Sequence, residues 1–146
     1  MVLWRISRHQ NLNGAGGLRA GARWNHPGHP IVYLAESPAG ALLEVCVHTA
    51  ANDVPPDFTL LRVEGPGLEV PSIAPAELPK DWRERIETTR DLGTHWLERK
   101  ESVLLRVPSA LVPQTANFLL NPLHPDAKMF QIIETLVYPF DARIKE

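Results

Sequence analysis

Proline limits the folds open to this chain more than any other residue. Fourteen prolines are spread along 146 residues. Proline is unfavourable inside helices and central strands because it lacks an N–H donor and holds φ near one value. The sequence therefore predicts short helices and strands joined by many ordered turns. The length suits one domain with a single hydrophobic core, and the chain contains no internal repeat and no low-complexity linker.

Apolar runs between the prolines predict an α+β domain. Ser37 followed by Pro38 is a typical helix start, which predicts a helix over residues 38–48. A second helical segment, over residues 79–99, should break into two pieces near Gly93. We expect strands at residues 1–7, 31–35, 58–64, 102–107 and 117–122, and a further strand with imperfect alternation at residues 129–140.

The bulk composition argues against several classes of protein. The formal net charge is −2 and the isoelectric point is about 6.3, which gives no indication of a surface for nucleic acid or anionic membrane. No apolar run approaches the roughly 20 residues that a membrane helix needs, and the N-terminus lacks a signal-peptide layout. The single cysteine, Cys46, cannot form an internal disulfide and is expected in the core. We therefore expect a cytoplasmic protein.

One carboxylate stands in the most apolar predicted helix. Glu44 lies within the run LLEVCV, residues 42–47, and His48 follows one helical turn later. Because an ionised carboxylate is costly to bury without a partner, Glu44 should lie at the rim, line a cleft or pair with a cation such as Arg5 or Arg23. Spacing alone slightly favours the ion pair.

The loop over residues 11–30 combines several glycines with an arginine. Gly16 and Gly17 precede Arg23 by only a few residues, and free backbone N–H groups beside a guanidinium form a natural anion site. The loop has neither the Gly-Lys-Ser/Thr of a phosphate-binding loop nor the spacing of a dinucleotide-binding fingerprint. On local grounds a flexible surface loop is therefore the simpler interpretation.

Other polar side chains allow two interpretations each. Tyr33, in the apolar run IVYLA, is either a core tyrosine or a stacking platform for a planar ring. Ser109 follows a predicted strand without a nucleophile-elbow motif, so it is either a loop hydroxyl or a hydrogen-bond partner for Glu44 or a ligand. Proline and glycine separate His26 from His29, and no zinc-binding spacing occurs, so we expect no metal site.

The chain contains five segments in this order: WRIS, GGLRAGARWNHPGHPIVYLAESPAGALLEVCVH, VLLRVPSALVP, NFLLNPLHP and YPFDARI. Together they resemble the RES-domain family, the toxins of RES–Xre toxin–antitoxin pairs, which is named after an arginine, a glutamate and a serine. The family's arginine falls on Arg23, its tyrosine on Tyr33, its glutamate on Glu44 and its serine on Ser109. The resemblance covers nearly the whole chain and implies one RES domain over residues 1–146.

The resemblance also implies a fold and an activity. The expected fold is a single α+β domain similar to ADP-ribosyltransferases, with a split β core, a few helices and a cleft for NAD. NAD would be a substrate, consumed by hydrolysis or phosphorolysis, and no cofactor is expected. An Xre-type antitoxin would cover the cleft and would itself contact DNA through a helix-turn-helix domain. A homodimer within that toxin–antitoxin complex is left open.

The resemblance assigns the centre of the site as follows. Glu44 would face the ribosyl cation that forms when the bond between nicotinamide and ribose breaks. Tyr33 would stack on the nicotinamide, and Ser109 would hold Glu44 or the nicotinamide end in place. His48 and Asn25 are further candidates for contacts to NAD.

The resemblance assigns the rest of the site to the Gly-rich loop. Arg23 would bind the pyrophosphate or the ribose, helped by the amides around Gly16 and Gly17. Two other functions stay open: a mono-ADP-ribosyltransferase that modifies a macromolecule, and a non-enzymatic binding module in which Glu44 and Arg23 form a structural pair. The segment of Trp82 and Trp96 and residues 129–140 allow two interpretations: apolar surface for a protein partner or a self-dimer, or plain core, which is the more usual case for such segments.

Overall fold

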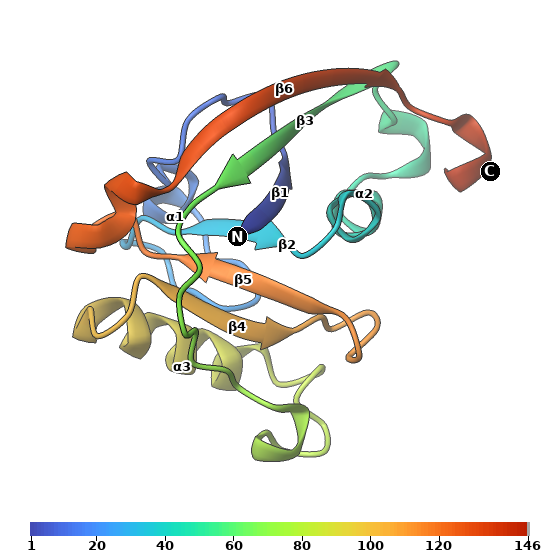
Figure 1. The fold of residues 1–146 in the computed structure, drawn as a ribbon. Coiled ribbons are helices and arrows are strands. Elements are labelled where there is room, and N and C mark those ends of the chain that lie inside the picture. The colour runs from blue at the N-terminus through green and yellow to red at the C-terminus, as the bar shows by residue number, and fades with distance from the viewer. Residues whose placement is uncertain (146) are drawn as a thin grey trace.

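The computed structural model describes residues 1–145 and contains a six-stranded sheet in the order β4-β5-β2-β1-β3-β6 (Figure 1). All neighbouring strands are antiparallel. The strands are β1 (Val2–Ile6), β2 (Val32–Ala35), β3 (Asp57–Glu64), β4 (Leu104–Pro108), β5 (Ala116–Leu120) and β6 (Gln131–Pro139). The helices are α1 (Gly16–Arg19), α2 (Pro38–Val47) and α3 (Ile86–Arg99), and the short 3₁₀ turns are η1 (Ala51–Asp53), η2 (Pro75–Glu77), η3 (Pro125–Met129) and η4 (Ala142–Lys145). The predicted α+β class is confirmed, as is the strand over residues 129–140.

The sheet is split in its middle. Strands β1 and β2 share a single register pair, Trp4 with Ala35, whereas β1 pairs with β3 over five positions and β2 with β5 over four. Three strands (β4, β5 and β2) thus form one half and three (β1, β3 and β6) the other, and the two halves diverge in Figure 1. The split β core implied by the resemblance is present.

Strands β2, β4 and β5 are largely buried on both faces. One core cluster joins the two halves and contains Leu3, Leu34, Val63, Phe118 and Phe130. The other lies under α3 and contains Trp24, Trp82, Leu97, Leu105 and Leu119. Neighbouring residues of β4 and β5 enter opposite clusters, as the two-residue period of a strand requires. Trp82 therefore belongs to the core, which is the more usual of the two interpretations of its segment.

The two long helices follow their capping signals. At α2 the Ser37 hydroxyl accepts a hydrogen bond from the Gly40 N–H at 3.0 Å, and Pro38 occupies the first turn, where no N–H partner is needed. Helix α3 ends at Lys100, whose φ of 52° places it in the left-handed region that ends many helices.

Gly93 does not break α3, contrary to the prediction. The helix runs without interruption from Ile86 to Arg99, because the glycine serves packing. A Cβ atom at position 93 would overlap the carbonyl oxygen of Trp24, which crosses the helix there. Residues 79–85 form turns and coil instead of a first helical piece, and the loop over residues 11–30 contains the short α1, which was not predicted.

Strand β6 is the long edge of the sheet. It pairs with β3 alone and exposes Ile133, Val137 and Tyr138 by 53%, 62% and 47%. The expected apolar contact surface over residues 129–140 is therefore partly present. No helix of residues 1–145 is long and apolar enough to cross a membrane.

Replacing Gly93 by alanine should destabilise the protein strongly, because the new methyl group must displace either α3 or the Trp24 backbone. Overpacking of this kind costs about 3 kcal/mol, which would lower Tm by roughly 10 °C in a domain of this size. Thermal unfolding followed by circular dichroism measures the shift. Gly67→Ala is the matched control, since a Cβ there meets nothing within 4 Å; equal Tm values for the two variants would contradict the packing argument.

Candidate functional site

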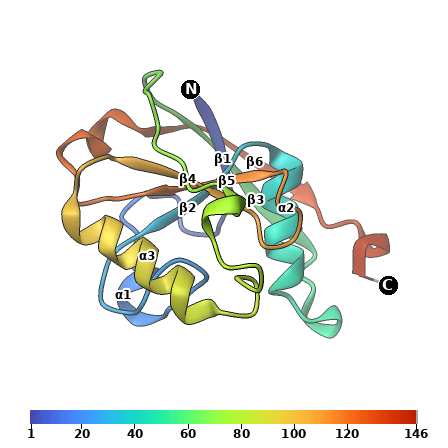
Figure 2. The ribbon, with the colours of Figure 1, turned by 90° about the horizontal axis from the view of Figure 1, so that it is seen from below.

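A cleft of about 600 Å³ opens where the sheet splits, within the usual range for small-molecule sites. Figure 2 shows α2 and α3 on opposite sides of the central strands, and both helices contribute to the cleft walls. The walls include Trp4 and Arg5 of β1, Tyr33 of β2, Glu44 of α2, His48 directly after α2, Arg23 and Trp24 of the loop, Ile86 and Arg90 of α3, and Asn117 of β5. The predicted residues Arg23, Tyr33, Glu44 and His48 thus line one cavity.

Two side-chain donors hold the Glu44 carboxylate. Its Oε1 accepts hydrogen bonds from the Ser109 hydroxyl and from the Asn117 side-chain amide, both at 2.9 Å. Ser109 is 1% exposed, and its oxygen in turn accepts the Leu111 N–H at 3.1 Å. The Oε2 atom has no hydrogen-bond partner within residues 1–145, so one carboxylate oxygen is fixed and the other is available to the cleft.

The ion pair that spacing slightly favoured for Glu44 does not form. No cationic side chain of the described residues lies within 4.0 Å of its carboxylate. Ser109 takes the position expected from its possible contact with Glu44. Asn117 was missed, and its only signal was an amide inside the apolar run NFLL.

Tyr33 is oriented by its hydroxyl. The hydroxyl donates to the Asn25 Oδ1 at 2.6 Å and accepts the Trp24 N–H at 3.0 Å. Burial raises the pKa of the phenol well above its usual range, against smaller lowering effects of the Trp24 N–H and the charges of Arg90 and Arg23. With the hydroxyl engaged, the ring is the part of Tyr33 left for a ligand.

Asn25 is a positioning residue. It is fully buried, and its amide donates to the carbonyls of Ala20 and His26 at 3.2 and 3.1 Å. Its oxygen accepts from Tyr33 and from the Ala22 N–H. Asn25 lies outside the lining of this cleft and instead lines a neighbouring hollow, so its predicted contact with NAD stays a prediction.

Three arginines line the cleft, against Glu44 as the one carboxylate in its lining among residues 1–145. Each is held by a backbone carbonyl. Arg5 donates to the carbonyl oxygen of Tyr33 at 3.2 Å, Arg23 to the carbonyl oxygen of Arg83 at 2.8 Å, and Arg90 to the carbonyl oxygen of Ala22 at 2.8 Å. Arg90 also pairs with Glu87 of the same helix at 3.7 Å, whereas Arg5 and Arg23 form no ion pair among residues 1–145. The cleft therefore keeps an excess of positive charge, which favours an anionic ligand.

Gly16 and Gly17 do not share the cleft with Arg23. They line a second hollow of about 320 Å³, and the Gly17 N–H is used within the loop, donating to the Gly14 carbonyl at 3.1 Å. The predicted joint anion site of Arg23 and these amides is therefore wrong in its geometry.

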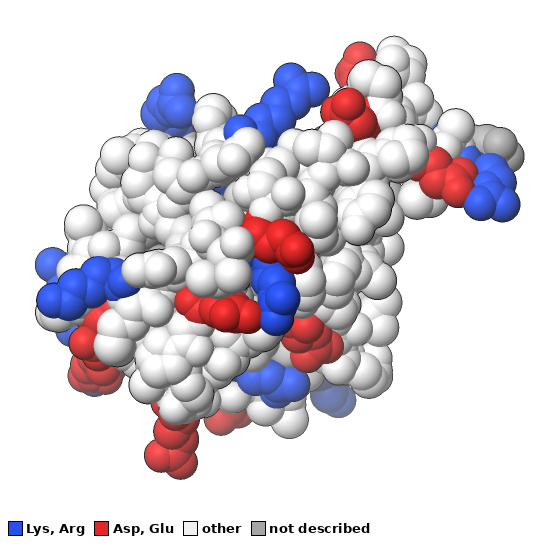
Figure 3. Space-filling model, turned by 45° about the horizontal axis from the view of Figure 1, so that its top comes forward, with Lys and Arg blue, Asp and Glu red and all other residues white. Residues whose placement is uncertain are grey.

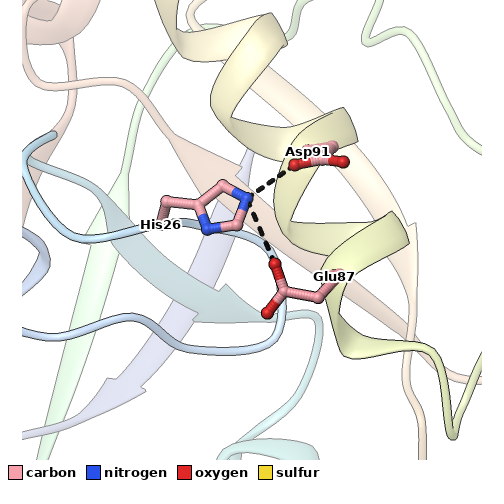
Figure 4. A group of neighbouring side chains, drawn as sticks. All are labelled: His26, Glu87 and Asp91. Carbon is pink, nitrogen blue, oxygen red and sulfur yellow. Dashed lines mark hydrogen bonds and ion pairs between the residues drawn. The ribbon is translucent and has the colours of Figure 1, made fainter.

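A cluster outside the cleft ties the loop of Arg23 to α3. His26 Nε2 lies 2.6 Å from Asp91 Oδ1 and 3.9 Å from Glu87 Oε2 (Figure 4). The three side chains are close enough to hold a metal ion, a grouping that no sequence spacing indicated because His26 and Asp91 are 65 residues apart. Two of the three are exposed carboxylates, and the hydrogen bond between His26 and Asp91 fastens the loop to the helix.

Comparison with known proteins decides the family, since the RES-domain sequence model matches residues 2–141. The chain belongs to the RES-domain family. It is 46% identical to a Pseudomonas putida protein named Toxin Res, over 90% of this chain and 92% of the relative. A Yersinia enterocolitica protein of the same name is 39% identical, over 99% of this chain and 100% of the relative. A Sphingobium relative named Prs ADP-ribosylating toxin is 34% identical, over 97% and 94%.

A solved structure shares the fold of this RES domain. One chain of the crystal structure of the M. tuberculosis MbcT–MbcA toxin–antitoxin complex matches it with a TM-score of 0.77. The match covers 94% of this chain and 84% of that chain at 20% sequence identity. The predicted family and the predicted single-domain fold are both confirmed.

The raised pKa of Tyr33 predicts that its phenol stays protonated in alkaline solution. In a Tyr138→Phe variant, Tyr33 is the only tyrosine left of two, and absorbance at 295 nm should show no phenolate at about pH 10, where half of a free tyrosine is ionised. Unfolding would release this proton above about pH 10, so the free energy of unfolding should fall as pH rises further. Phenolate absorbance in the folded variant at about pH 10 would contradict the prediction.

Proposed function

We propose that this RES-domain protein is a toxin that depletes NAD by cleaving the bond between nicotinamide and ribose. The observation that carries the proposal is the carboxylate of Glu44. Its Oε1 is held by two hydrogen bonds while its Oε2 is available to a ligand, and the same cleft is lined by three arginines. Such a cleft suits a substrate that carries anionic phosphates and develops a positive charge at one place. NAD has both properties, because its ribosyl carbon approaches an oxocarbenium ion as nicotinamide leaves.

Glu44 supplies the electrostatic part of this mechanism. Nicotinamide leaves as a neutral ring, so no strong general acid is required. A carboxylate about 4 Å from the ribosyl cation contributes about 4 kcal/mol at an effective dielectric constant of about 20, and each 1.4 kcal/mol corresponds to tenfold in rate. Because Ser109 and Asn117 already hold Oε1, the charge is oriented before the substrate arrives.

The remaining lining residues bind and orient the substrate. The Tyr33 ring stacks on the nicotinamide, and Arg23, which is fixed to the Arg83 carbonyl, binds the ribose or pyrophosphate end. His48, exposed at the end of α2, borders the mouth of the cleft. Attack on the ribosyl carbon by water yields ADP-ribose, and attack by inorganic phosphate yields ADP-ribose 1″-phosphate.

A second function within the same site is supported by one relative. The Sphingobium protein is named an ADP-ribosylating toxin, and the cleft described for NAD would serve equally if a macromolecule accepted the ADP-ribose.

Incubation of purified protein with NAD labelled in the adenosine half, with and without phosphate and with cell extract, separates the acceptors. Label retained on a macromolecule supports the transferase, and undiminished NAD supports a binding module.

We also propose that an antitoxin of the Xre type neutralises the protein by covering this cleft. The structural neighbour was solved as a toxin–antitoxin complex, and β6 offers exposed apolar side chains for protein contact. The face shown in Figure 3 carries acidic and basic side chains interspersed, without a broad patch of one sign. DNA contact would then come through the antitoxin.

Replacing Glu44 by glutamine should lower kcat for NAD cleavage by about 10² or more while leaving the fold intact. The substitution keeps the shape and a hydrogen-bonding oxygen but removes the charge that faces the ribosyl cation. Nicotinamide release measures kcat, and thermal unfolding measures the fold. Glu36→Gln is the matched control, because Glu36 also accepts a hydrogen bond near β5, from the Ala116 N–H, outside the cleft lining. A Glu44→Gln protein with full activity would refute the mechanism.

Removing the Asn117 amide should lower kcat with little change in KM. Asn117→Ala leaves Ser109 as the one side-chain donor to Glu44 among residues 1–145, so the carboxylate is charged but less well oriented, and we expect a loss of about tenfold. Steady-state kinetics with NAD separates kcat from KM. An increase in KM alone would show that Asn117 binds substrate and does not position Glu44.

A further inference from the structure

Two carboxylates of α3 converge on one imidazole of the loop over residues 11–30. Glu87 and Asp91 are four residues apart in a regular helix, so their side chains project from the same face. His26 lies opposite them, with its Nε2 2.6 Å from Asp91 Oδ1 and 3.9 Å from Glu87 Oε2 (Figure 4). None of the three side chains lines the cleft, so this cluster has no part in the function proposed above.

The imidazole alone does not satisfy both carboxylates. Its Nε2 carries at most one proton, and the hydrogen bond to Asp91 uses that proton. Like charges four residues apart also destabilise a helix. The guanidinium of Arg90 lies 3.7 Å from Glu87 Oε1, which leaves Oε2, the oxygen on the side of His26, to the cluster. A cation bound between the three side chains would offset the repulsion between the two carboxylates.

The backbones that carry the three side chains are held in place. The His26 N–H donates to Thr94 Oγ1 at 2.9 Å, and the preceding residue, Asn25, is fully buried. The side chains of Glu87 and Asp91 are 72% and 74% exposed, so their ends can adjust and the cluster is open to ions and water. Fixed backbones with an open path to solvent are what a metal site on a protein surface requires.

We propose that His26, Glu87 and Asp91 bind a divalent transition-metal ion, zinc in the first place, and that the ion fastens the loop to α3. One imidazole nitrogen and two carboxylate oxygens form a donor set that suits zinc, whereas magnesium and calcium prefer oxygen ligands alone. The same loop contributes Arg23 to the cleft, so the bound ion would stabilise one wall of it. The proposal does not depend on the cleavage of NAD.

The geometry of the cluster is close to that of a zinc site. With zinc–ligand distances of about 2.1 Å, the ligand atoms of a tetrahedral ion lie about 3.4 Å apart. The three candidate ligand atoms lie within 4.8 Å of one another, and the distances of 2.6 and 3.9 Å from His26 Nε2 fall on either side of the ideal value. Small rotations of the exposed carboxylates would bring all three to that spacing, with water as the fourth ligand.

Two neighbouring histidines provide comparisons. His29 faces one carboxylate among residues 1–145, that of Glu98 at 3.6 Å, and zinc sites in proteins use three or four protein ligands. His95 follows Asp91 by one turn of α3 but does not belong to the group of three among the described residues. The proposed site therefore needs the histidine of the loop and neither of these two.

Calorimetric titration of the purified protein with zinc chloride, magnesium chloride and calcium chloride tests the site. We expect one zinc ion per chain and no binding of magnesium or calcium at the same concentrations. Because the ion binds only the folded protein, zinc at about 100 times its Kd should raise Tm by about 5–10 °C.

Replacing one ligand at a time locates the ion. His26→Gln, Glu87→Gln and Asp91→Asn should each weaken zinc binding about tenfold or more, since even outer-shell partners of a metal contribute that much. His29→Gln and His95→Gln are the matched controls and should leave the affinity unchanged. Tm without zinc, measured for each variant, separates loss of the site from loss of the fold, and the highly exposed Glu87 is the ligand whose replacement disturbs the fold least.

Hydrogen–deuterium exchange tests whether the ion fastens the loop. Zinc should slow exchange of the amides of residues 22–28 in the wild-type protein and have no such effect in His26→Gln. Absence of zinc binding, or binding without slower exchange in this loop, would overturn the inference. Binding that His26→Gln leaves unchanged, or that His95→Gln weakens instead, would place the ion elsewhere and overturn it as well.

Discussion

The single register pair between β1 and β2 is the constraint on which the rest of the structure depends. A fully paired sheet would leave no room for a cavity between its strands, whereas here the halves diverge and their facing side chains form the cleft. The Arg5 guanidinium reaches across the split to the Tyr33 carbonyl and replaces part of the missing ladder. Because one side chain both bridges the split and lines the cleft, the sheet and the proposed binding site are physically coupled.

Helix α3 fixes the loop that faces this split. Thr89 donates to the Arg23 carbonyl at 2.6 Å, Arg90 donates to that of Ala22, and the His26 N–H donates to the Thr94 hydroxyl at 2.9 Å. Gly93 allows the helix to approach the loop closely enough for these bonds. The loop has little regular structure of its own, so its shape, and with it the placement of Tyr33 through Asn25, depends on a helix more than sixty residues away in sequence.

Local patterns predicted what local forces determine. Capping placed α2 almost to the residue, and the apolar runs located all six strands, because hydrogen-bond satisfaction and burial act over a few residues. The relation between Glu44 and its partners is different. Ser109 could be proposed as a partner from the sequence, but Asn117 could not. Asn117 comes close to Glu44 and Ser109 through the antiparallel pairing of β4, β5 and β2, and no local pattern predicts this pairing. The same limit explains why Gly16 and Gly17 were assigned to one anion site with Arg23. These glycines are close to Arg23 in sequence, but they line the second hollow, together with Arg5 of β1, whereas Arg23 lines the main cleft.

The charges in the cleft lead to one further step. Three arginines face one carboxylate, and Glu44 is held by neutral donors instead of being paired with any of them. An ion pair to Arg5 or Arg23 would have neutralised the negative charge that a ribosyl cation requires and the positive charge that a diphosphate requires. The separation of the two signs within one cavity costs stability in the empty protein. A ligand that is anionic in its middle and becomes cationic at its ribosyl carbon would recover that cost as it reacts, which is the condition for binding the transition state more tightly than the substrate.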